Sequence, residues 1–379
     1  MKERNRRICL GLQFLRSANS RILEVLVPKF AYDFIRSIFW LNFLFSFVEI
    51  LSSILNYFVG KIFDKVDIRK ALAFDSAFDS AVLVLFPYAK SKIFVSSLVI
   101  ARRAFSPLKI GLKTIYTKLG FSSQKDLTYF SYTRSLGRTI ASLSIFFLLY
   151  LLSYKLVFYI SAVLLIISIF LIAKLPNVNL KIKKPKIKLK TRKVLKKKWK
   201  YIAISSLQNF HYGLLYFPAI IIFMTEVLHF SLQFVYLIYG LGTLFALPFF
   251  KLNYKRNHLS AILLLMALFT LLYLSPLYNK GFGVYLFIVS WISISILFYP
   301  YYGLINSLYI EGIPKHKQGE YWGVLRPFSS ISSFLGTLMG GIIASTSFKL
   351  LILSSSFVLF LTWVISVIPS YREDMRRKI

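Results

Sequence analysis

The chain has 379 residues, 57% of them hydrophobic and 16% charged, with a formal net charge of +34. A soluble domain carries about 25% charged residues, so the composition excludes an ordinary soluble protein. A charge this positive would suggest a nucleic-acid partner in a soluble protein, but its distribution along an apolar chain argues against nucleic acid. The single cysteine, Cys9, excludes an intrachain disulfide and a cysteine-rich metal site.

Apolar runs of about 20 residues, the length that crosses a hydrocarbon core as a helix, follow one another along the chain. They are continuously apolar rather than alternating, which favours helices over a membrane β-barrel. The sequence therefore predicts an all-α membrane protein with twelve transmembrane helices, at 8–30, 37–59, 71–89, 93–112, 130–152, 156–174, 201–224, 230–250, 257–276, 282–307, 321–344 and 349–369.

The basic residues are distributed unequally between the two sides that these spans define. Breaks on the side of the N-terminus hold 33 Lys and Arg residues, and the opposite breaks hold 7. The positive-inside rule then places both termini in the cytoplasm, and an even number of helices fits that orientation. The short apolar run before Arg16 lacks a cleavage site for a signal peptide. We predict a multi-pass protein of the plasma membrane.

A basic stretch divides the helices into two sets of six. We expect an N-terminal bundle at 1–174, a cytoplasmic linker at 175–200 and a C-terminal bundle at 201–379. The lysines of the linker serve orientation and solubility in one interpretation. In the other, residues 181–200 bind anionic lipid headgroups, since each basic residue near such a surface contributes about 1 kcal/mol.

The loop between the second and third predicted helices reads GKIFDKVDIRK, residues 60–70. It resembles the loop signature of the major facilitator superfamily, G-x-x-x-D-[RK]-x-G-[RK]-[RK], with matches at Gly60, Asp64, Lys65 and Arg69. Asp67 replaces the second glycine of that signature, and Ile68 replaces one of its basic residues. The segments 246–258 and 311–341 resemble the family's corresponding second-half loop and its helix 11, where Gly336 and Gly340 have the spacing of close helix contacts.

This resemblance implies two pseudo-twofold six-helix bundles that move around a central substrate site by alternating access. It also implies that Asp64 latches the cytoplasmic end of helix 11, where the partial positive charge of a helix N-terminus would attract a carboxylate. The alternative is a loop that only sets topology. Monomeric function is the family's usual state. We expect no catalytic residue, no metal site and no cofactor, and the sequence has no nucleotide-binding P-loop.

Ionisable residues within the spans are functional candidates because burying charge in a bilayer is costly. Asp79 is about 13 Å into its helix at ~1.5 Å per residue, and Arg102 or Arg103 reaches a similar depth from the other side, so a pair is expected. The candidate proton and charge relay comprises Glu24, Glu49, Asp75, Asp79, Arg102 and Arg103. Each pair has a purely structural alternative, in which it only neutralises buried charge.

Helices 1, 4, 7 and 10 line the cavity in the resembled family. The substrate-cavity candidates on three of these helices are Arg16, Asn19, Gln208, His211, Tyr212, Tyr299 and Asn306. His211 is alternatively a hydrogen-bonded packing residue. Arg134 and Arg138 either snorkel to headgroups or form an anion-attracting mouth, and the first interpretation is preferred.

The leading hypothesis is a secondary active transporter that moves a small solute with protons. The excess of basic residues in the spans mildly favours an anionic substrate. Multidrug efflux by antiport is the alternative of the same class. A polytopic enzyme such as a prenyltransferase is the alternative of another class, because 75–79 has D-x-x-x-D spacing. Such enzymes need a second acidic cluster for Mg²⁺–diphosphate, and the sequence has none.

Overall fold

The structure is a computed structural model that describes residues 2–63, 67–104, 112, 115–116, 119–121, 124–176, 191–251, 258–310 and 318–368. The described residues are predominantly helical, with no strand among them. They divide into two compact units. Unit 1 comprises Met1–Lys184 and Ile221–Leu247, and unit 2 comprises Pro185–Ile220 and Pro248–Ile379.

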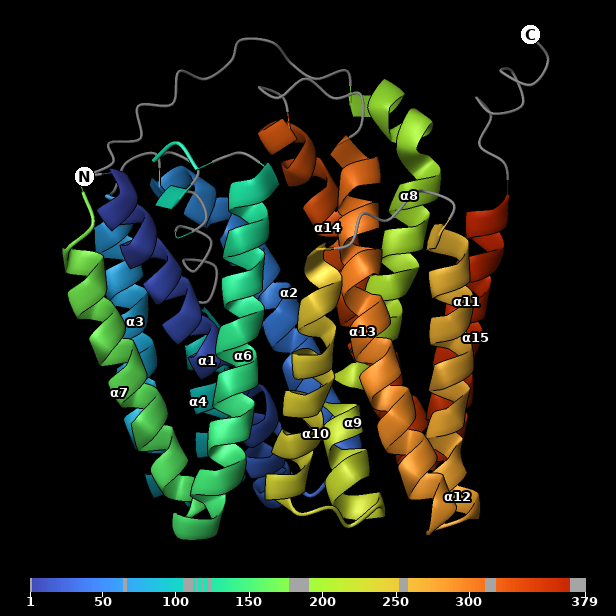
Figure 1. Ribbon diagram of the computed structural model, residues 1–379. Helices are drawn as coiled ribbons and strands as arrows, with labels where there is room; N and C mark the ends of the chain where they lie inside the picture. Colours follow the sequence, from blue (N-terminus) through green and yellow to red (C-terminus); the bar gives the residue numbers. More distant parts are fainter. Residues whose placement is uncertain are drawn as a thin grey trace, which may run out of the picture. The chain divides into compact units, whose positions relative to one another are not determined.

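Unit 1 begins with two long helices joined by a short break (Figure 1). Its helices are α1 (Lys2–Ile35), α2 (Ile38–Phe63), α3 (Ile68–Leu85), α4 (Lys92–Ala104), α6 (Gln124–Leu151), α7 (Tyr154–Ala173) and α10 (Leu232–Ala246). The short helix η1 (Phe86–Tyr88) extends α3, and the π-helix η4 (Phe223–Val227) precedes α10.

Unit 2 contains the remaining helices. They are α8 (Thr191–His211), the π-helix η3 (Tyr212–Tyr216), α11 (His258–Leu271), η6 (Leu272–Leu274), α12 (Ser275–Tyr278), α13 (Phe282–Ile310), α14 (Gln318–Thr346) and α15 (Phe348–Val367). The short helix α9 (Ala219–Ile222) lies where the chain passes from unit 2 into unit 1, and η5 (Leu247–Lys251) lies where it returns.

Each of the twelve predicted spans overlaps a helical segment of the described chain, which confirms the all-α membrane class. Nine helices in the described ranges are long and apolar enough to cross a membrane. The helix α1 is not among them, because charged residues such as Arg16, Arg21 and Glu24 interrupt its apolar sequence. The helix α8 begins at Thr191, ten residues before its predicted start, since the lysine-rich end of the expected linker consists largely of good helix formers.

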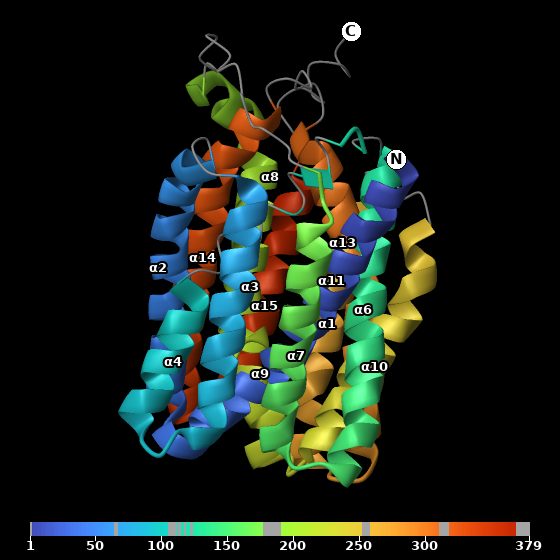
Figure 2. The ribbon, with the colours of Figure 1, turned by 90° about the vertical axis from the view of Figure 1, so that its left-hand side faces the viewer.

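The helix α6 lies at the centre of the packing in unit 1, with α1 on one flank and α10 on the other. Figure 2 shows α7 beside α3. Between α6 and α10, the Thr139 hydroxyl donates to the Thr243 hydroxyl at 3.0 Å. The Tyr236 hydroxyl of α10 donates to the backbone oxygen of Ile22 in α1. These contacts place 221–247 in unit 1, whereas the predicted boundaries assign that segment to the second bundle.

Glycines allow the close packing of α14 on α8 and η3 in unit 2. A Cβ at Gly336 would overlap the backbone oxygen of Phe210, and one at Gly340 would overlap that of Leu214. Gly213 faces the opposite way, against the backbone oxygen of Ser333. The predicted small-residue spacing in 311–341 therefore marks a contact between helix backbones, as the spacing suggests.

Two lysines in the first half of α8 bind the ends of other helices. The Lys198 Nζ donates to the backbone oxygen of Leu308 near the end of α13 at 2.7 Å, and Lys200 donates to that of Ile368, just after α15. The last carbonyls of a helix lack partners within it and carry partial negative charge. These two lysines, both inside the expected linker, therefore stabilise the fold of unit 2.

Candidate functional site

A deeply buried ion pair of unit 1 joins α1 to α3. The Arg16 Nη2 donates to Asp75 Oδ2 at 2.5 Å and to the Ser76 hydroxyl at 2.9 Å, and the side chains of Arg16 and Asp75 are 9% and 1% exposed. Nε and Nη1 of Arg16 are buried and have no hydrogen-bond partner among the described residues. Arg16 therefore combines one ionic partner with unused donors.

A second ion pair lies one helical turn along α3. The Arg102 Nε of α4 is 3.0 Å from Asp79 Oδ1, and these side chains are 8% and 2% exposed. Asp75 and Asp79 share a face of α3 because they are four residues apart. The structure thus brings two carboxylates of one helix against guanidinium groups from two different helices.

A third cluster forms around Glu24, deeper along α1. Its carboxylate accepts from Arg138 of α6 and lies 3.5 Å from Arg21 Nη1 of its own helix. The Arg21 guanidinium also covers the ring of Tyr239 in α10, at 4.8 Å from the ring centroid. Neither arginine is among the predicted site residues. Arg138 was expected to snorkel toward headgroups, but the rotation of α6 turns its side chain toward α1 instead.

A fourth ionic contact ties α1 to η4. The Lys29 Nζ lies 2.6 Å from Asp33 Oδ1 and 2.7 Å from Glu226 Oε1. All three side chains are partly exposed, between 23% and 32%. Sequence reasoning missed this contact because the three residues lie at the ends of predicted spans, where charged residues are ordinary.

The loop before α3 explains why an aspartate can stand where the resembled signature has a glycine. Asp67 is the N-cap of α3, and its side chain accepts from the backbone N–H of Arg69 at 3.0 Å. The Arg69 guanidinium donates to the same carboxylate at 2.8 Å and to the backbone oxygen of Leu175 at 2.9 Å. These hydrogen bonds from Arg69 hold the pKa of Asp67 below its usual value.

The polar residues of unit 2 gather where α8 passes into η3. The His211 side chain is fully buried, and its Nδ1 lies 2.7 Å from the Ser355 hydroxyl of α15. Its Nε2, like Oε1 of Gln208, is buried without a hydrogen-bond partner in the described part of the chain. The ring of His211 lies edge-on to Tyr216, whose ring contacts Trp291 at 5.5 Å between centroids.

Comparison with known proteins identifies the family. A sequence model described as the Major Facilitator Superfamily matches residues 124–337, more than half of the chain. The chain belongs to the major facilitator superfamily. The resemblance read from the loop signature is therefore confirmed, and membership makes this chain a multi-pass membrane transporter, a class that is generally not enzymatic.

Solved structures of other major facilitators share the fold. The nucleoside transporter NupG has a TM-score of 0.74 and 14% identity, over 96% of this chain and 100% of that one. The human organic anion transporter MFSD10 (TETRAN) has a TM-score of 0.68 and 13% identity, over 96% and 99%. An inward-facing bacterial homologue of the iron transporter ferroportin has a TM-score of 0.69 and 14% identity, over 96% of this chain and 98% of that one. No curated protein sequence matches this chain significantly.

The other predicted site residues of this major facilitator lie on several different helices. Asn19 is buried in α1, Glu49 is half-buried in α2, and Arg103 is half-buried beside Arg102. Tyr212 stacks on Tyr216 at 5.8 Å between ring centroids. Tyr299 packs on Phe250 at 4.4 Å between ring centroids. Asp64, Lys65 and the side chain of Asn306 lie outside the described residues, and Gly60 is described only as part of the backbone of α2.

The described residues contain no group of three His, Cys, Asp or Glu side chains that could hold a metal ion. The D-x-x-x-D pair, Asp75 and Asp79, contacts arginines instead. These two ion pairs connect α3 to α1 and to α4.

Proposed function

We propose that this major facilitator is a secondary active transporter that moves a small organic anion together with protons by alternating access. The observation that carries the proposal is the ionic cluster of unit 1. Four guanidinium groups, those of Arg16, Arg21, Arg102 and Arg138, meet three carboxylates there. In these four contacts the arginines outnumber the carboxylates by one.

The anionic substrate follows from the unused donors of Arg16. Burying an N–H group without a partner costs about 1–3 kcal/mol, and more when the group is charged. An anionic substrate would supply acceptors for these charged donors, and charge-assisted hydrogen bonds from arginine to a carboxylate are strong. The solved relatives, described as transporting nucleosides, organic anions or metals, share too little sequence with this chain to choose a substrate.

Proton coupling rests on the two carboxylates of α3. A carboxylate at this depth is charged while its arginine stays close and binds a proton when that arginine withdraws, because an isolated buried charge is disfavoured. Movement of α1 or α4 against α3 would therefore change the protonation of Asp75 or Asp79. This links the conformational cycle to proton uptake and release.

The test uses the purified chain in liposomes that contain a trapped pH-sensitive dye. Small carboxylic acids, nucleosides and cationic drugs are added one class at a time. We expect carboxylic acids to produce proton flux. We expect Arg16→Gln to abolish both substrate uptake and proton flux, and Asp79→Asn to abolish proton flux while substrate exchange persists. Asp67→Asn, which changes a carboxylate outside the span, is the matched control and should transport normally.

Two results would contradict the proposal. Proton flux with nucleosides or cationic drugs and none with carboxylic acids would exclude an anionic substrate. Proton flux that survives both Asp75→Asn and Asp79→Asn would remove the carboxylates of α3 from the proton path and leave them as structural partners of the arginines.

We also propose that the chain resides in the plasma membrane with both termini in the cytoplasm, because the basic residues of the breaks favour that side. Labelling of single cysteines from outside the cell tests this orientation. With Cys9 replaced by serine, a cysteine at Lys280 should react with a membrane-impermeant thiol reagent, and one at Lys2 should not.

A further inference from the structure

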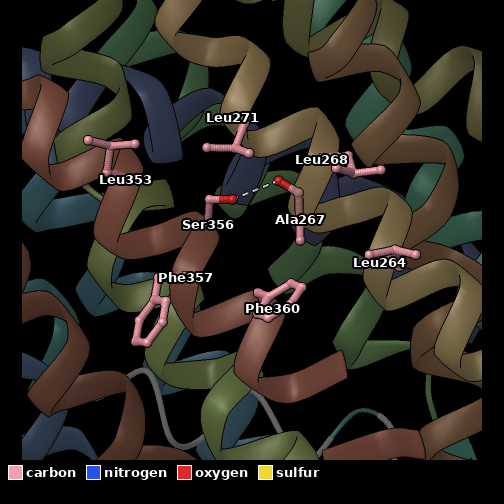
Figure 3. A pocket seen from close by; sticks show the side chains of 8 residues that line it. All are labelled: Leu264, Ala267, Leu268, Leu271, Leu353, Ser356, Phe357 and Phe360. Carbon is pink, nitrogen blue, oxygen red and sulfur yellow. Dashed lines mark hydrogen bonds between the residues drawn. The ribbon is translucent and has the colours of Figure 1, made fainter. Parts of the chain in front are cut away.

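A groove lies between α11 and α15 of unit 2 (Figure 3). Its walls are apolar side chains: Leu264, Leu268 and Leu271 from α11, and Leu353, Phe357 and Phe360 from α15. Its volume is about 270 Å³. Several wall residues are open to the surface, Phe357 being 60% and Leu268 50% exposed. Both helices are long and apolar enough to span a membrane, so the groove opens toward lipid.

The groove offers no polar group to a ligand. Its one hydroxyl, on Ser356, already donates to the backbone oxygen of Ala267 at 2.8 Å and holds the two helices together. A ligand in the groove must therefore be apolar along its whole buried length. An acyl chain has this property, and a polar solute does not.

A positive charge stands at one end of the groove. Lys349, exposed at the start of α15, lies four residues before Leu353 and shares its helix face. Its Nζ is 5.0 Å from the centroid of the Tyr278 ring, at the end of α12. The helices are antiparallel there, so Leu271 and Leu353 are the wall residues next to this end, while Leu264 and Phe360 are farthest from it.

The dimensions suit a membrane lipid. The wall residues of α15 extend from about 6 Å to about 16 Å beyond Lys349, at ~1.5 Å per residue. This depth corresponds to about one leaflet of a ~30 Å hydrocarbon core. A phosphate beside Lys349 would also meet the partial positive charge at the N-terminus of α15 and the exposed hydroxyl of Tyr278.

We propose that the groove between α11 and α15 binds one acyl chain of an anionic phospholipid, whose phosphate pairs with Lys349 beside Tyr278. The site belongs to unit 2 alone and does not depend on the transported substrate. It differs from the expected contact of residues 181–200 with headgroups, because it holds a single lipid by its chain and its headgroup together.

The test locates the lipid by crosslinking. The full chain is reconstituted in phosphatidylcholine vesicles with a small fraction of phosphatidylglycerol that carries a photoreactive diazirine in one acyl chain. After illumination, the crosslinked peptides are identified by mass spectrometry. We expect labelling of peptides from α11 and α15 that unlabelled phosphatidylglycerol suppresses more strongly than unlabelled phosphatidylcholine does.

Two pairs of variants separate this site from general lipid contact. Leu268→Trp fills the groove and should remove the labelling, whereas Leu265→Trp, also at an exposed position of α11 but outside the groove, should not. Lys349→Gln should lower the preference for phosphatidylglycerol about fivefold, the equivalent of the ~1 kcal/mol expected for one basic residue near a lipid surface. Lys155→Gln, at the same second position of α7, should leave the preference unchanged.

Equal labelling of the wild type and Leu268→Trp would overturn the acyl-chain site. Equal competition by phosphatidylglycerol and phosphatidylcholine in the wild type would overturn the role of Lys349. Should Leu268→Trp fail to fold, Leu268→Phe is the smaller filler to compare with Leu265→Phe.

Discussion

Separating Arg16 from Asp75 should cost far more than deleting both charges. Arg16→Met takes the contacting arginine away from a carboxylate that is 1% exposed, and Asp75→Asn takes the contacting carboxylate away from a buried guanidinium. Removing one member of a buried pair typically costs about 3–5 kcal/mol, whereas replacing both is often nearly neutral. We therefore expect a coupling energy above about 2 kcal/mol in the double-mutant cycle.

The cycle is measured as thermal unfolding of the four detergent-solubilised proteins. For folding units of 150–250 residues, 1 kcal/mol shifts the Tm by about 2–4 °C, so each single variant should unfold about 6–20 °C below the wild type. The double variant should recover most of that loss. Ser20→Met, at an exposed position one turn along α1, is the control and should leave the Tm unchanged.

Additive losses in the double variant would refute this reasoning, because they would show that each side chain acts through other partners. A shift of less than about 1 °C in Arg16→Met would refute the burial on which the estimate depends. Either result would also weaken the proposed anion site, since that site needs Arg16 held at depth by Asp75.

Three further predictions test contacts elsewhere in the chain. Gly340→Leu should prevent unit 2 from folding, because even a Cβ overlaps the facing backbone; loss of the monodisperse peak in gel filtration measures this, and an unchanged profile would contradict it. The stabilisation that Asp67 gains from Arg69 is present above the ordinary carboxyl pKa and is lost as the pH falls through the lowered one; Asp67→Asn should flatten the dependence of the Tm on pH between about 5 and 3, and an unaltered profile would count against the cap. Glu226→Gln should lower the free energy of unfolding by no more than about 1 kcal/mol, and only while Lys29 is present, because exposed ion pairs are weak. A larger effect of Glu226→Gln in a Lys29→Met background than in the wild type would contradict the pairing.

The sequence predicts the spans of this protein well because hydrophobic length is a one-dimensional property. A run that covers a hydrocarbon core is visible without knowledge of its neighbours. Depth is equally readable: it suggests a pair between Asp79 and either Arg102 or Arg103, and in the structure Asp79 contacts Arg102. The functional roles proposed for these residues remain predictions.

The rotation of each helix about its axis is not readable in the same way. Arg16 and Glu24 are eight residues apart on α1, but their ionic contacts turn toward different helices, α3 and α6. Which side of α6 faces α1 depends on packing, including a close approach in which a Cβ at Gly137 would overlap the backbone of Phe14. A periodic pattern names the residues of a helix face but not the helix opposite.

The two units differ in the chemistry of their spans, and this difference constrains any coupling mechanism. The ion pairs described for the spans all lie in unit 1. In unit 2, away from the ends of the spans, the described side chains include one group that can change charge near neutral pH, the imidazole of His211. That group is fully buried beside the ring of Tyr216 and the Ser355 hydroxyl, an environment that disfavours charge. A proton that moves with the substrate is therefore expected to bind in unit 1, and unit 2 to supply apolar and aromatic contacts. His211→Asn, which preserves hydrogen bonding to Ser355 but cannot titrate, should retain proton flux, whereas loss of flux with intact substrate exchange would move the coupling site to unit 2.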